Sequence, residues 1–187
     1  MLRAVLVDFD GTLVESERAN AAAYAAALGE HGVAVEAEAI LPRITGRAWG
    51  DFLPELLAEA PGTEPAAVAR RKRAIYPDFF RLIRPNEALA DLLRATRLGS
   101  LATGLVTTAA SGSTEAILDR FALRDLFDIL VCGDHVSRAK PDPEGYQLAA
   151  RQLGVRPEEC MVIEDSETGL AAARAFGGHV LRWTSGT

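Results

Sequence analysis

The sequence predicts an α/β fold in which helices cover a parallel sheet and a small all-helical segment is inserted after the first strand. From residue 85 onward, short apolar runs alternate with amphipathic stretches, as in βαβ units. Between residues 16 and 84 the pattern is helical, too long for a simple crossover and too regular for a loop. We therefore expect residues 1–14 plus 85–187 to form the core domain and residues 15–84 a helical cap.

The expected cap begins with an alanine-rich helix over residues 16–31, and two short helices follow over residues 36–60. A longer helix comes next, and Pro77 should kink or restart it. This helix carries the basic run Arg70 to Arg73. Two interpretations of that run stay open, namely a solvated face or a positive rim that attracts anionic substrates.

The core strands are expected to be short and buried because their sequences are apolar runs bounded by turns. Helices should separate them. The expected strands cover residues 3–8, 101–107, 129–132 and 160–163, with residues 179–183 as a short last strand.

Two core helices have recognisable first residues. In Pro141-Asp142-Pro143, we expect Asp142 as the N-cap and Pro143 as the first helical residue, with the helix running to Gly154. Ser166 is expected to cap the last helix.

The composition is that of an ordinary globular protein. Of 187 residues, 49% are hydrophobic and 25% are charged. The formal net charge of −6 argues against a nucleic-acid or anionic-membrane partner. No apolar run approaches the ~20 residues of a membrane span, and the N-terminus has no signal-peptide pattern. Cys132 and Cys160 are expected to be buried free thiols, so we expect a cytoplasmic protein.

Two carboxylates, Asp8 and Asp10, follow the first expected strand. Residues two apart on a strand share a face, so both side chains can look into one small volume. Like charges held that close need a counter-charge, and a hard cation such as Mg²⁺ with oxygen ligands supplies one. Gly11 follows, as a turn with positive φ would favour. A solvated acidic turn is the simpler alternative.

Other polar residues lie at or just beyond the ends of later strands. In a parallel sheet the carboxyl ends of the strands meet at one edge, so residues far apart in sequence can converge there. Taken singly, each residue is explained as a strand terminus, a surface lysine or a capping turn. Their occurrence after successive strands instead indicates a common site. The set comprises Thr107, Thr108, Lys140, Glu164 and Asp165.

These residues give the chain a resemblance to the haloacid dehalogenase superfamily of hydrolases. It resembles the subgroup with a small helical cap, which is similar to phosphoglycolate phosphatase and β-phosphoglucomutase. The resemblance covers residues 3 to about 182 and implies a Rossmann-like core. The motifs that carry it are Asp8-Phe9-Asp10-Gly11-Thr12-Leu13-Val14, Val106-Thr107-Thr108, Lys140-Pro141-Asp142-Pro143, and Ile163-Glu164-Asp165-Ser166 with Gly169.

The resemblance also implies a chemistry, phosphoryl transfer through an aspartyl-phosphate. Asp8 would be the nucleophile, and Asp10 the general acid and then the general base. The implied Mg²⁺ takes a carboxylate oxygen of Asp8, the backbone carbonyl of Asp10 and the carboxylate of Asp165. Glu164 would assist directly or through a water. Lys140 would neutralise charge on the phosphate and on Asp8.

Further residues are expected to bind the substrate. The resemblance places Thr107, Thr108 and Gly11 around the phosphoryl oxygens. Gly46 and Arg47 resemble a cap loop that faces the site, where Arg47 would bind a substrate hydroxyl, carboxylate or second phosphate. An exposed arginine at a helix start is the alternative for Arg47.

The expected substrate is a small phosphorylated metabolite, such as a sugar phosphate or phosphoglycolate. Asp10 favours a phosphate ester, because a halide leaving group needs no proton. One alternative is a β-phosphoglucomutase-like phosphomutase, disfavoured by Asn20, where mutase relatives have a histidine. Another is a non-catalytic regulatory module that binds phosphate or metal, disfavoured by the complete set of catalytic residue types. The oligomeric state stays open.

Overall fold

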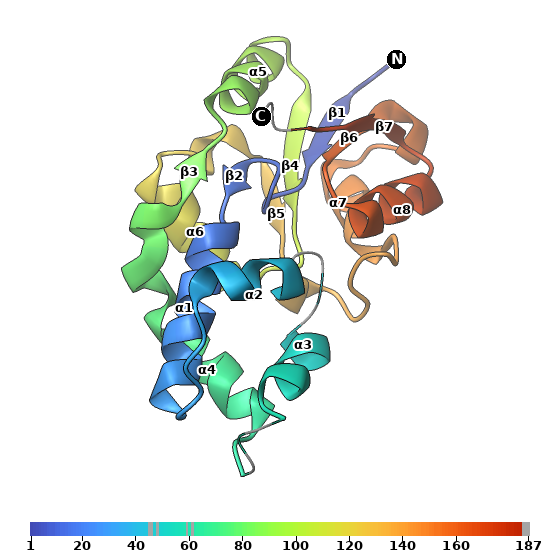
Figure 1. The fold of residues 1–187 in the computed structure, drawn as a ribbon. Coiled ribbons are helices and arrows are strands. Elements are labelled where there is room, and N and C mark those ends of the chain that lie inside the picture. Colours follow the sequence, from blue (N-terminus) through green and yellow to red (C-terminus); the bar gives the residue numbers. More distant parts are fainter. Residues whose placement is uncertain (45–46, 48, 59, 61, 185–187) are drawn as a thin grey trace. The chain divides into compact units, whose positions relative to one another are not determined.

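The structure is a computed structural model that describes residues 1–44, 47, 49–58, 60 and 62–184 (Figure 1). The chain forms two compact units. One, called the core here, comprises Met1–Glu15 and the chain from Pro85 onward, and the other, called the cap, comprises Ser16–Arg84. Glu15, which the sequence-based boundary assigned to the cap, falls in the core unit.

The core contains a five-stranded parallel sheet with the strand order β5-β4-β1-β6-β7. This confirms the predicted α/β class. The central strand β1 pairs with β4 on one side and with β6 on the other, so three strand ends lie next to each other. The strands are β1 (Ala4–Val7), β4 (Ala102–Val106), β5 (Ile129–Val131), β6 (Cys160–Glu164) and β7 (His179–Arg182).

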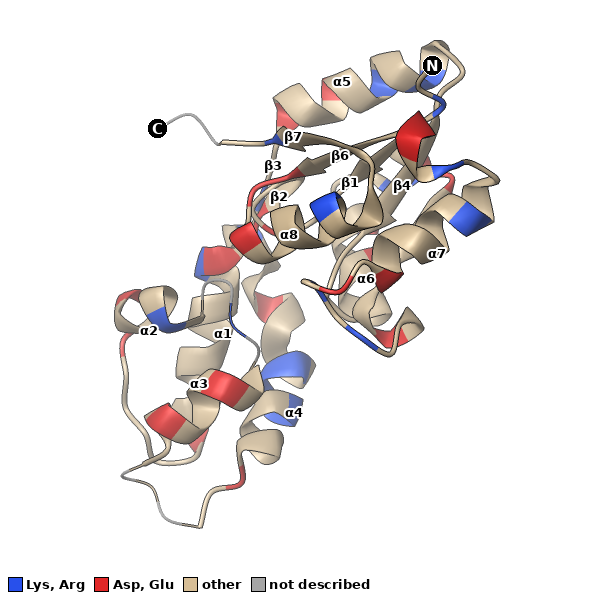
Figure 2. Ribbon diagram, turned by 90° about the vertical axis from the view of Figure 1, so that its right-hand side faces the viewer, with Lys and Arg blue, Asp and Glu red and all other residues tan. Residues whose placement is uncertain are grey.

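Helices lie on both sides of this sheet. Figure 2 shows α5 on the opposite side of the sheet from α7 and α8. Apolar side chains of α7 and α8, among them Ala149 and Phe176, pack against Leu6 and Val162 of the sheet in one buried cluster. The core helices are α5 (Glu87–Leu98), α6 (Ser111–Arg120), α7 (Glu144–Leu153) and α8 (Glu167–Phe176).

The start of α7 corrects one prediction. Asp142 was expected to be the N-cap, but α7 begins at Glu144 with Pro143 as its N-cap. Pro143 has a ψ of 1°, outside the helical range, so the regular helix starts one residue later than expected. The Asp142 carboxylate instead accepts a hydrogen bond from the Glu144 N–H at 2.9 Å. The C-terminal prediction is confirmed, because Gly154 ends the helix in the left-handed conformation with φ 64°.

The start of α8 agrees with the sequence. The Ser166 hydroxyl accepts a hydrogen bond from the Gly169 N–H at 3.1 Å, which confirms Ser166 as the N-cap. The buried free thiols are confirmed as well, for Cys132 and Cys160.

The cap is helical in its described part. Its helices are α1 (Glu17–Glu30), α2 (Ala37–Ile44), α3 (Trp49–Leu56) and α4 (Pro65–Ile75), and a 3₁₀ segment (Tyr76–Leu82) follows α4. The regular helix stops just before Pro77, as expected of a residue that disrupts helical hydrogen bonding. Leu28, Ile40, Phe52, Leu53 and Val68 form the buried centre of the cap.

Short elements complete the chain. Strands β2 (Val14–Glu15) and β3 (Arg84–Pro85) form a separate two-stranded sheet. Three single 3₁₀ turns cover Arg124–Leu126, Gly133–His135 and Pro157–Glu159. Among the residues that the structure describes, there is no helix of the length and apolar character that a bilayer span requires.

Candidate active site

Asp8 stands directly after β1, at the middle of the sheet. Its N–H continues the strand pairing by donating to the carbonyl of Ile163 at 3.0 Å. The residue is 7% exposed, so its carboxylate is largely shielded from water. Gly11 turns the chain with a φ of +84°, and its N–H is bonded to the Val14 carbonyl at 2.8 Å. The turn after β1 therefore holds Asp8 at the carboxyl end of the central strand.

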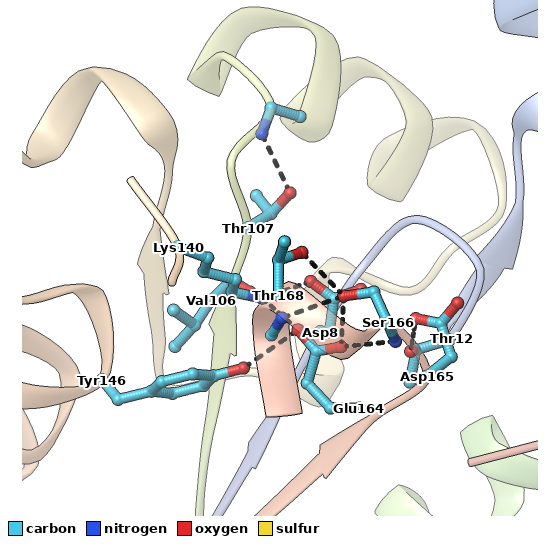
Figure 3. A network of polar contacts seen from close by, with 12 residues as sticks. Asp8, Thr12, Val106, Thr107, Lys140, Tyr146, Glu164, Asp165, Ser166 and Thr168 are labelled. Atoms are coloured by element: carbon cyan, nitrogen blue, oxygen red, sulfur yellow. Dashed lines mark hydrogen bonds and ion pairs between the residues drawn. The ribbon is translucent and has the colours of Figure 1, made fainter. Parts of the chain in front are cut away.

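Lys140 reaches the same point from the loop before α7. Its Nζ donates to Asp8 Oδ1 at 2.5 Å and to Glu164 Oε1 at 2.6 Å (Figure 3). A third hydrogen bond goes to the Val106 carbonyl at 3.0 Å, so every ammonium proton has an acceptor. The Lys140 side chain is 8% exposed. The structure thus brings together residues that are far apart in the sequence.

Glu164, the last residue of β6, is completely buried. Its Oε1 accepts from Lys140 and also from the Tyr146 hydroxyl at 3.2 Å, and its Oε2 accepts from the N–H and the hydroxyl of Ser166, each at 3.0 Å. Gly169 lies so close that a Cβ there would be 1.7 Å from Oε1. Both carboxylate oxygens are therefore held by protein groups, and only glycine fits at position 169.

Asp165 is oriented by Thr12, which follows β1, and not by Lys140. Its Oδ1 accepts a hydrogen bond from the Thr12 hydroxyl at 2.8 Å. Thr12 is buried, and its own carbonyl accepts from the Asn86 side chain at 2.9 Å. These contacts fix Thr12 and thereby one oxygen of Asp165.

These side chains form an acidic group that fits a divalent cation. Asp8, Glu164 and Asp165 each offer a carboxylate oxygen, and these atoms lie within 4.8 Å of one another. One ammonium group accompanies the three carboxylates, so negative charge is in excess. Hard divalent cations prefer such oxygen ligands. The side chain of Asp10, which is half-buried, is not part of this group.

Burial dominates the electrostatics of the acidic group. It raises the pKa of Asp8 to about 7, even though the Lys140 ammonium acts in the opposite direction. Burial also raises the pKa of Asp165, against the hydrogen bond from Thr12. Desolvation works against the charged form of Lys140, yet Asp8, Tyr146 and Glu164 outweigh it and raise the pKa of the ammonium. Lys140 therefore stays charged, and the carboxylates favour a cation beside them.

The turn after β4 lies beside this network. Thr107 is buried, and its hydroxyl accepts a hydrogen bond from the Ala109 N–H at 3.0 Å. Thr108 is exposed, and Gly133 lies against its carbonyl so closely that a Cβ would be 2.3 Å from the oxygen. At the start of α6, the Ser111 N–H donates to Asp134 at 3.0 Å. The N–H groups of Ala109 and Ser111 are thus already bonded within the protein.

The cap residue Arg47, unlike the residues of the buried acidic group, is at the protein surface. The Arg47 guanidinium pairs with Glu55 at 2.5 Å and donates to the Asp51 carbonyl at 3.1 Å, and Arg47 is exposed. Gly46 lies outside the described residues. In the basic run, Arg71 pairs with Glu30 on α1, whereas Lys72 is half-buried. A substrate-binding role for Gly46 and Arg47 stays a prediction.

Lys72 differs from its basic neighbours. Its Nζ donates to the Asn20 side chain at 2.5 Å and lies 3.7 Å from the centroid of the Tyr76 ring. The solvated-face interpretation therefore fits the exposed Arg70, Arg71 and Arg73 but not Lys72.

Sequence reasoning missed Tyr146. Tyr146, Ala149 and Ala150 form the buried face of α7 at helical spacing, and Tyr146 is the member of this face that carries a side-chain polar group. A buried tyrosine hydroxyl needs a partner, and this requirement is the signal that could have drawn attention to it.

The comparisons with known proteins agree with this geometry. A family model described as haloacid dehalogenase-like hydrolase matches residues 2–177. The chain is 32% identical over 179 residues to validoxylamine A 7'-phosphate phosphatase of Streptomyces hygroscopicus subsp. limoneus, covering 95% of this chain and 83% of that protein. It is 30% identical over 174 residues to fructose-1-phosphate phosphatase YqaB of Escherichia coli, covering 92% of each.

A solved structure is similar over most of the chain as well. The crystal structure of CbbY from Rhodobacter sphaeroides in complex with phosphate has a TM-score of 0.84 and 28% sequence identity. The match covers 96% of this chain and 85% of that one.

Proposed function

Because the chain belongs to the haloacid dehalogenase-like hydrolase family, we propose that it is a Mg²⁺-dependent phosphatase of a small phosphorylated metabolite. The observation that carries the proposal is the buried contact of 2.5 Å between Lys140 Nζ and Asp8, a carboxylate at the end of the central strand. The two curated relatives described above are phosphatases of a validoxylamine phosphate and of fructose 1-phosphate. Their names support a phosphorylated sugar or a similar small phosphorylated metabolite as the substrate class.

Asp8 is proposed as the nucleophile. One of its carboxylate oxygens attacks phosphorus, forming the Oδ–P bond of an acyl phosphate while the ester P–O bond breaks. The leaving alkoxide takes a proton from Asp10. A water then attacks the aspartyl-phosphate and gives its proton to Asp10, which restores Asp8 and releases inorganic phosphate. Lys140 holds the attacking carboxylate in place throughout, because its ammonium is fixed by Glu164 and the Val106 carbonyl.

The proposed metal ligands are Asp8, the carbonyl of Asp10 and Asp165. When bound there, Mg²⁺ offsets the repulsion between the nucleophile and the anionic phosphate. Glu164 is proposed to act mainly on Lys140, because both of its oxygens already accept hydrogen bonds from protein groups. Thr107, Thr108 and Gly11 remain the proposed contacts of the phosphoryl group, and Gly46 and Arg47 those of the rest of the substrate.

An assay of the purified protein with an aryl phosphate and a panel of phosphorylated metabolites tests the proposal. Hydrolysis is expected with Mg²⁺ and is expected to stop on addition of EDTA. Asp8→Asn should abolish turnover, because an amide cannot form the phosphoenzyme, while the protein still folds. Asp91→Asn, the same change at an exposed carboxylate of α5, is the matched control and should retain wild-type activity.

Two results would count against the proposal. Turnover that survives in Asp8→Asn would exclude Asp8 as the nucleophile. A phosphosugar that is isomerised rather than hydrolysed would favour the phosphomutase alternative, and product analysis separates these outcomes.

A further inference from the structure

We propose that Tyr146 is a positioning residue that holds Glu164 against Lys140 and so fixes the ammonium group beside Asp8. This inference rests on the proposed function, in which Asp8 is the nucleophile. It assigns a role to a buried hydroxyl that none of the sequence motifs contains.

The hydroxyl and the ammonium meet at one atom. Tyr146 OH donates to Glu164 Oε1 at 3.2 Å, and Lys140 Nζ donates to the same oxygen at 2.6 Å (Figure 3). The centroid of the Tyr146 ring lies 5.1 Å from Nζ, within the range of a cation–π contact. Tyr146 therefore touches both members of the ion pair, and α7 supplies it from a fully buried position.

The remaining contacts of Glu164 show what the hydroxyl adds. Ser166 holds Oε2 through two hydrogen bonds, and Gly169 lies directly against the carboxylate. On Oε1, the hydroxyl fixes the direction from which Lys140 can approach. Without it, Oε1 would keep its hydrogen bond from Lys140 but lose the one from α7, so this oxygen and the ammonium could shift relative to Asp8 while Ser166 still holds Oε2.

A purely structural role would depend on the ring rather than on the hydroxyl. The Tyr146 ring packs against Phe176 of α8, with 5.9 Å between the ring centroids. Two substitutions separate these roles. Tyr146→Phe removes the hydroxyl and keeps the ring, whereas Phe176→Leu disturbs the packing of the ring and keeps the hydroxyl.

Steady-state kinetics of the Mg²⁺-loaded enzyme are the first test. The lost hydrogen bond runs from the Tyr146 hydroxyl to the Glu164 carboxylate, and its effect reaches Asp8 only through Lys140, so Tyr146→Phe should lower kcat by roughly five- to tenfold. KM should change less than about twofold, because the effect lies in the alignment of the nucleophile. Phe176→Leu should lower the melting temperature and leave kcat within about twofold of wild type. Wild-type kcat in Tyr146→Phe, or an equal loss in Phe176→Leu, would overturn the proposal.

A second measurement does not depend on activity. NMR of protein labelled with ¹⁵N in its lysine side chains reports the solvent exchange of the Lys140 ammonium protons, and Lys140→Met assigns the signal. Exchange should be at least about threefold faster in Tyr146→Phe than in wild type, since a held and buried ammonium exchanges slowly. Equal rates would contradict the positioning role. If the wild-type protein hydrolyses no phosphate ester, the proposed function fails, and this experiment still decides what Tyr146 does to Lys140.

Discussion

Ion pairs of the core site and of the cap surface both join a basic side chain to carboxylates, but they lie in different surroundings. Lys140 is 8% exposed and stands between Asp8 and Glu164, whose side chains are 10% and 0% exposed. In the cap, Arg47 and Glu55 are 36% and 51% exposed. Charges attract strongly where water is absent, and charges at the surface are screened. In the core each charge therefore depends on its partner, whereas in the cap the partners are nearly independent.

This difference indicates how the two units serve one enzyme. Removing one member of a buried group leaves the others charged and unpaired, so a change at Asp8, Lys140 or Glu164 is expected to disturb the other two. Exposed pairs tolerate replacement, so the cap surface can be altered while its apolar centre keeps the fold. Two substitutions and a change of pH test this contrast between the buried and the exposed ion pairs.

The largest effect is expected for Lys140→Ala. Turnover should fall by more than about a thousandfold, because in the proposed mechanism the charge on the phosphoryl group and on Asp8 is then no longer neutralised. The free energy of unfolding should fall by about 3–5 kcal/mol, since Asp8 and Glu164 are left without their buried cation. Urea denaturation monitored by circular dichroism measures the second change.

Arg71→Ala is the matched control for this substitution. It breaks the exposed pair with Glu30 in the cap, so its urea midpoint should stay at the wild-type value. Equal destabilisation by Lys140→Ala and Arg71→Ala would remove the distinction between the buried and the exposed pairs.

A smaller effect is expected from pH on metal binding. Burial raises the pKa of Asp8 from 3.8 to about 7, so below that pH a proton would compete with the metal ion that we propose Asp8 binds. Mg²⁺ affinity should rise about tenfold per pH unit up to about pH 7 and then level off. Without metal, the native protein binds the Asp8 proton more tightly than the unfolded chain does. Proton binding therefore stabilises the native metal-free protein at low pH, and this stabilisation is lost as pH rises through about 7.

Melting temperatures with Mg²⁺ and with EDTA test this expectation from pH 5.5 to 8. The difference between the two should widen as pH rises towards 7, because metal binding strengthens while the metal-free protein loses stability. Asp8→Asn should make this difference in melting temperature nearly independent of pH. If the difference in the wild-type protein narrows as pH rises, the expected competition between proton and metal ion is wrong.

The smallest effect on stability is expected for Arg47→Ala. The pair with Glu55 is solvent-exposed, so the melting temperature should not change measurably. If Arg47 binds the substrate, KM rises while kcat is kept, because the contact acts on ground state and transition state alike. Glu55→Ala is the control, since it breaks the same pair and keeps the guanidinium. Unchanged KM in both variants would exclude Arg47 from substrate binding.

Much of the core could be predicted from the sequence because its signals are local. Apolar runs mark the strands, and in a parallel arrangement the polar residues after them must meet at one edge. Asp8, Lys140 and Glu164 converge in the structure for this reason. The N-cap of α8 is equally local, since Ser166 bonds to the N–H of Gly169 three residues later.

Other features depend on contacts that no local pattern contains. The hydrogen bond from Tyr146 to Glu164 joins residues 18 positions apart and exists only when α7 packs against the sheet. The contact of Thr12 with Asp165 spans 153 positions. The incorrect N-cap at Asp142 has a subtler cause, because the backbone of Pro143 rather than the capping preference of aspartate decides where α7 begins.

The position of β1 in the sheet has a consequence for folding kinetics. Its neighbours β4 and β6 are both distant in sequence, and the whole cap is inserted between β1 and β4. Pairings of this kind close long loops, whereas the helices of the cap form from nearby residues. During refolding, helical signal should therefore recover before enzymatic activity does, so that activity reports the last stage of assembly.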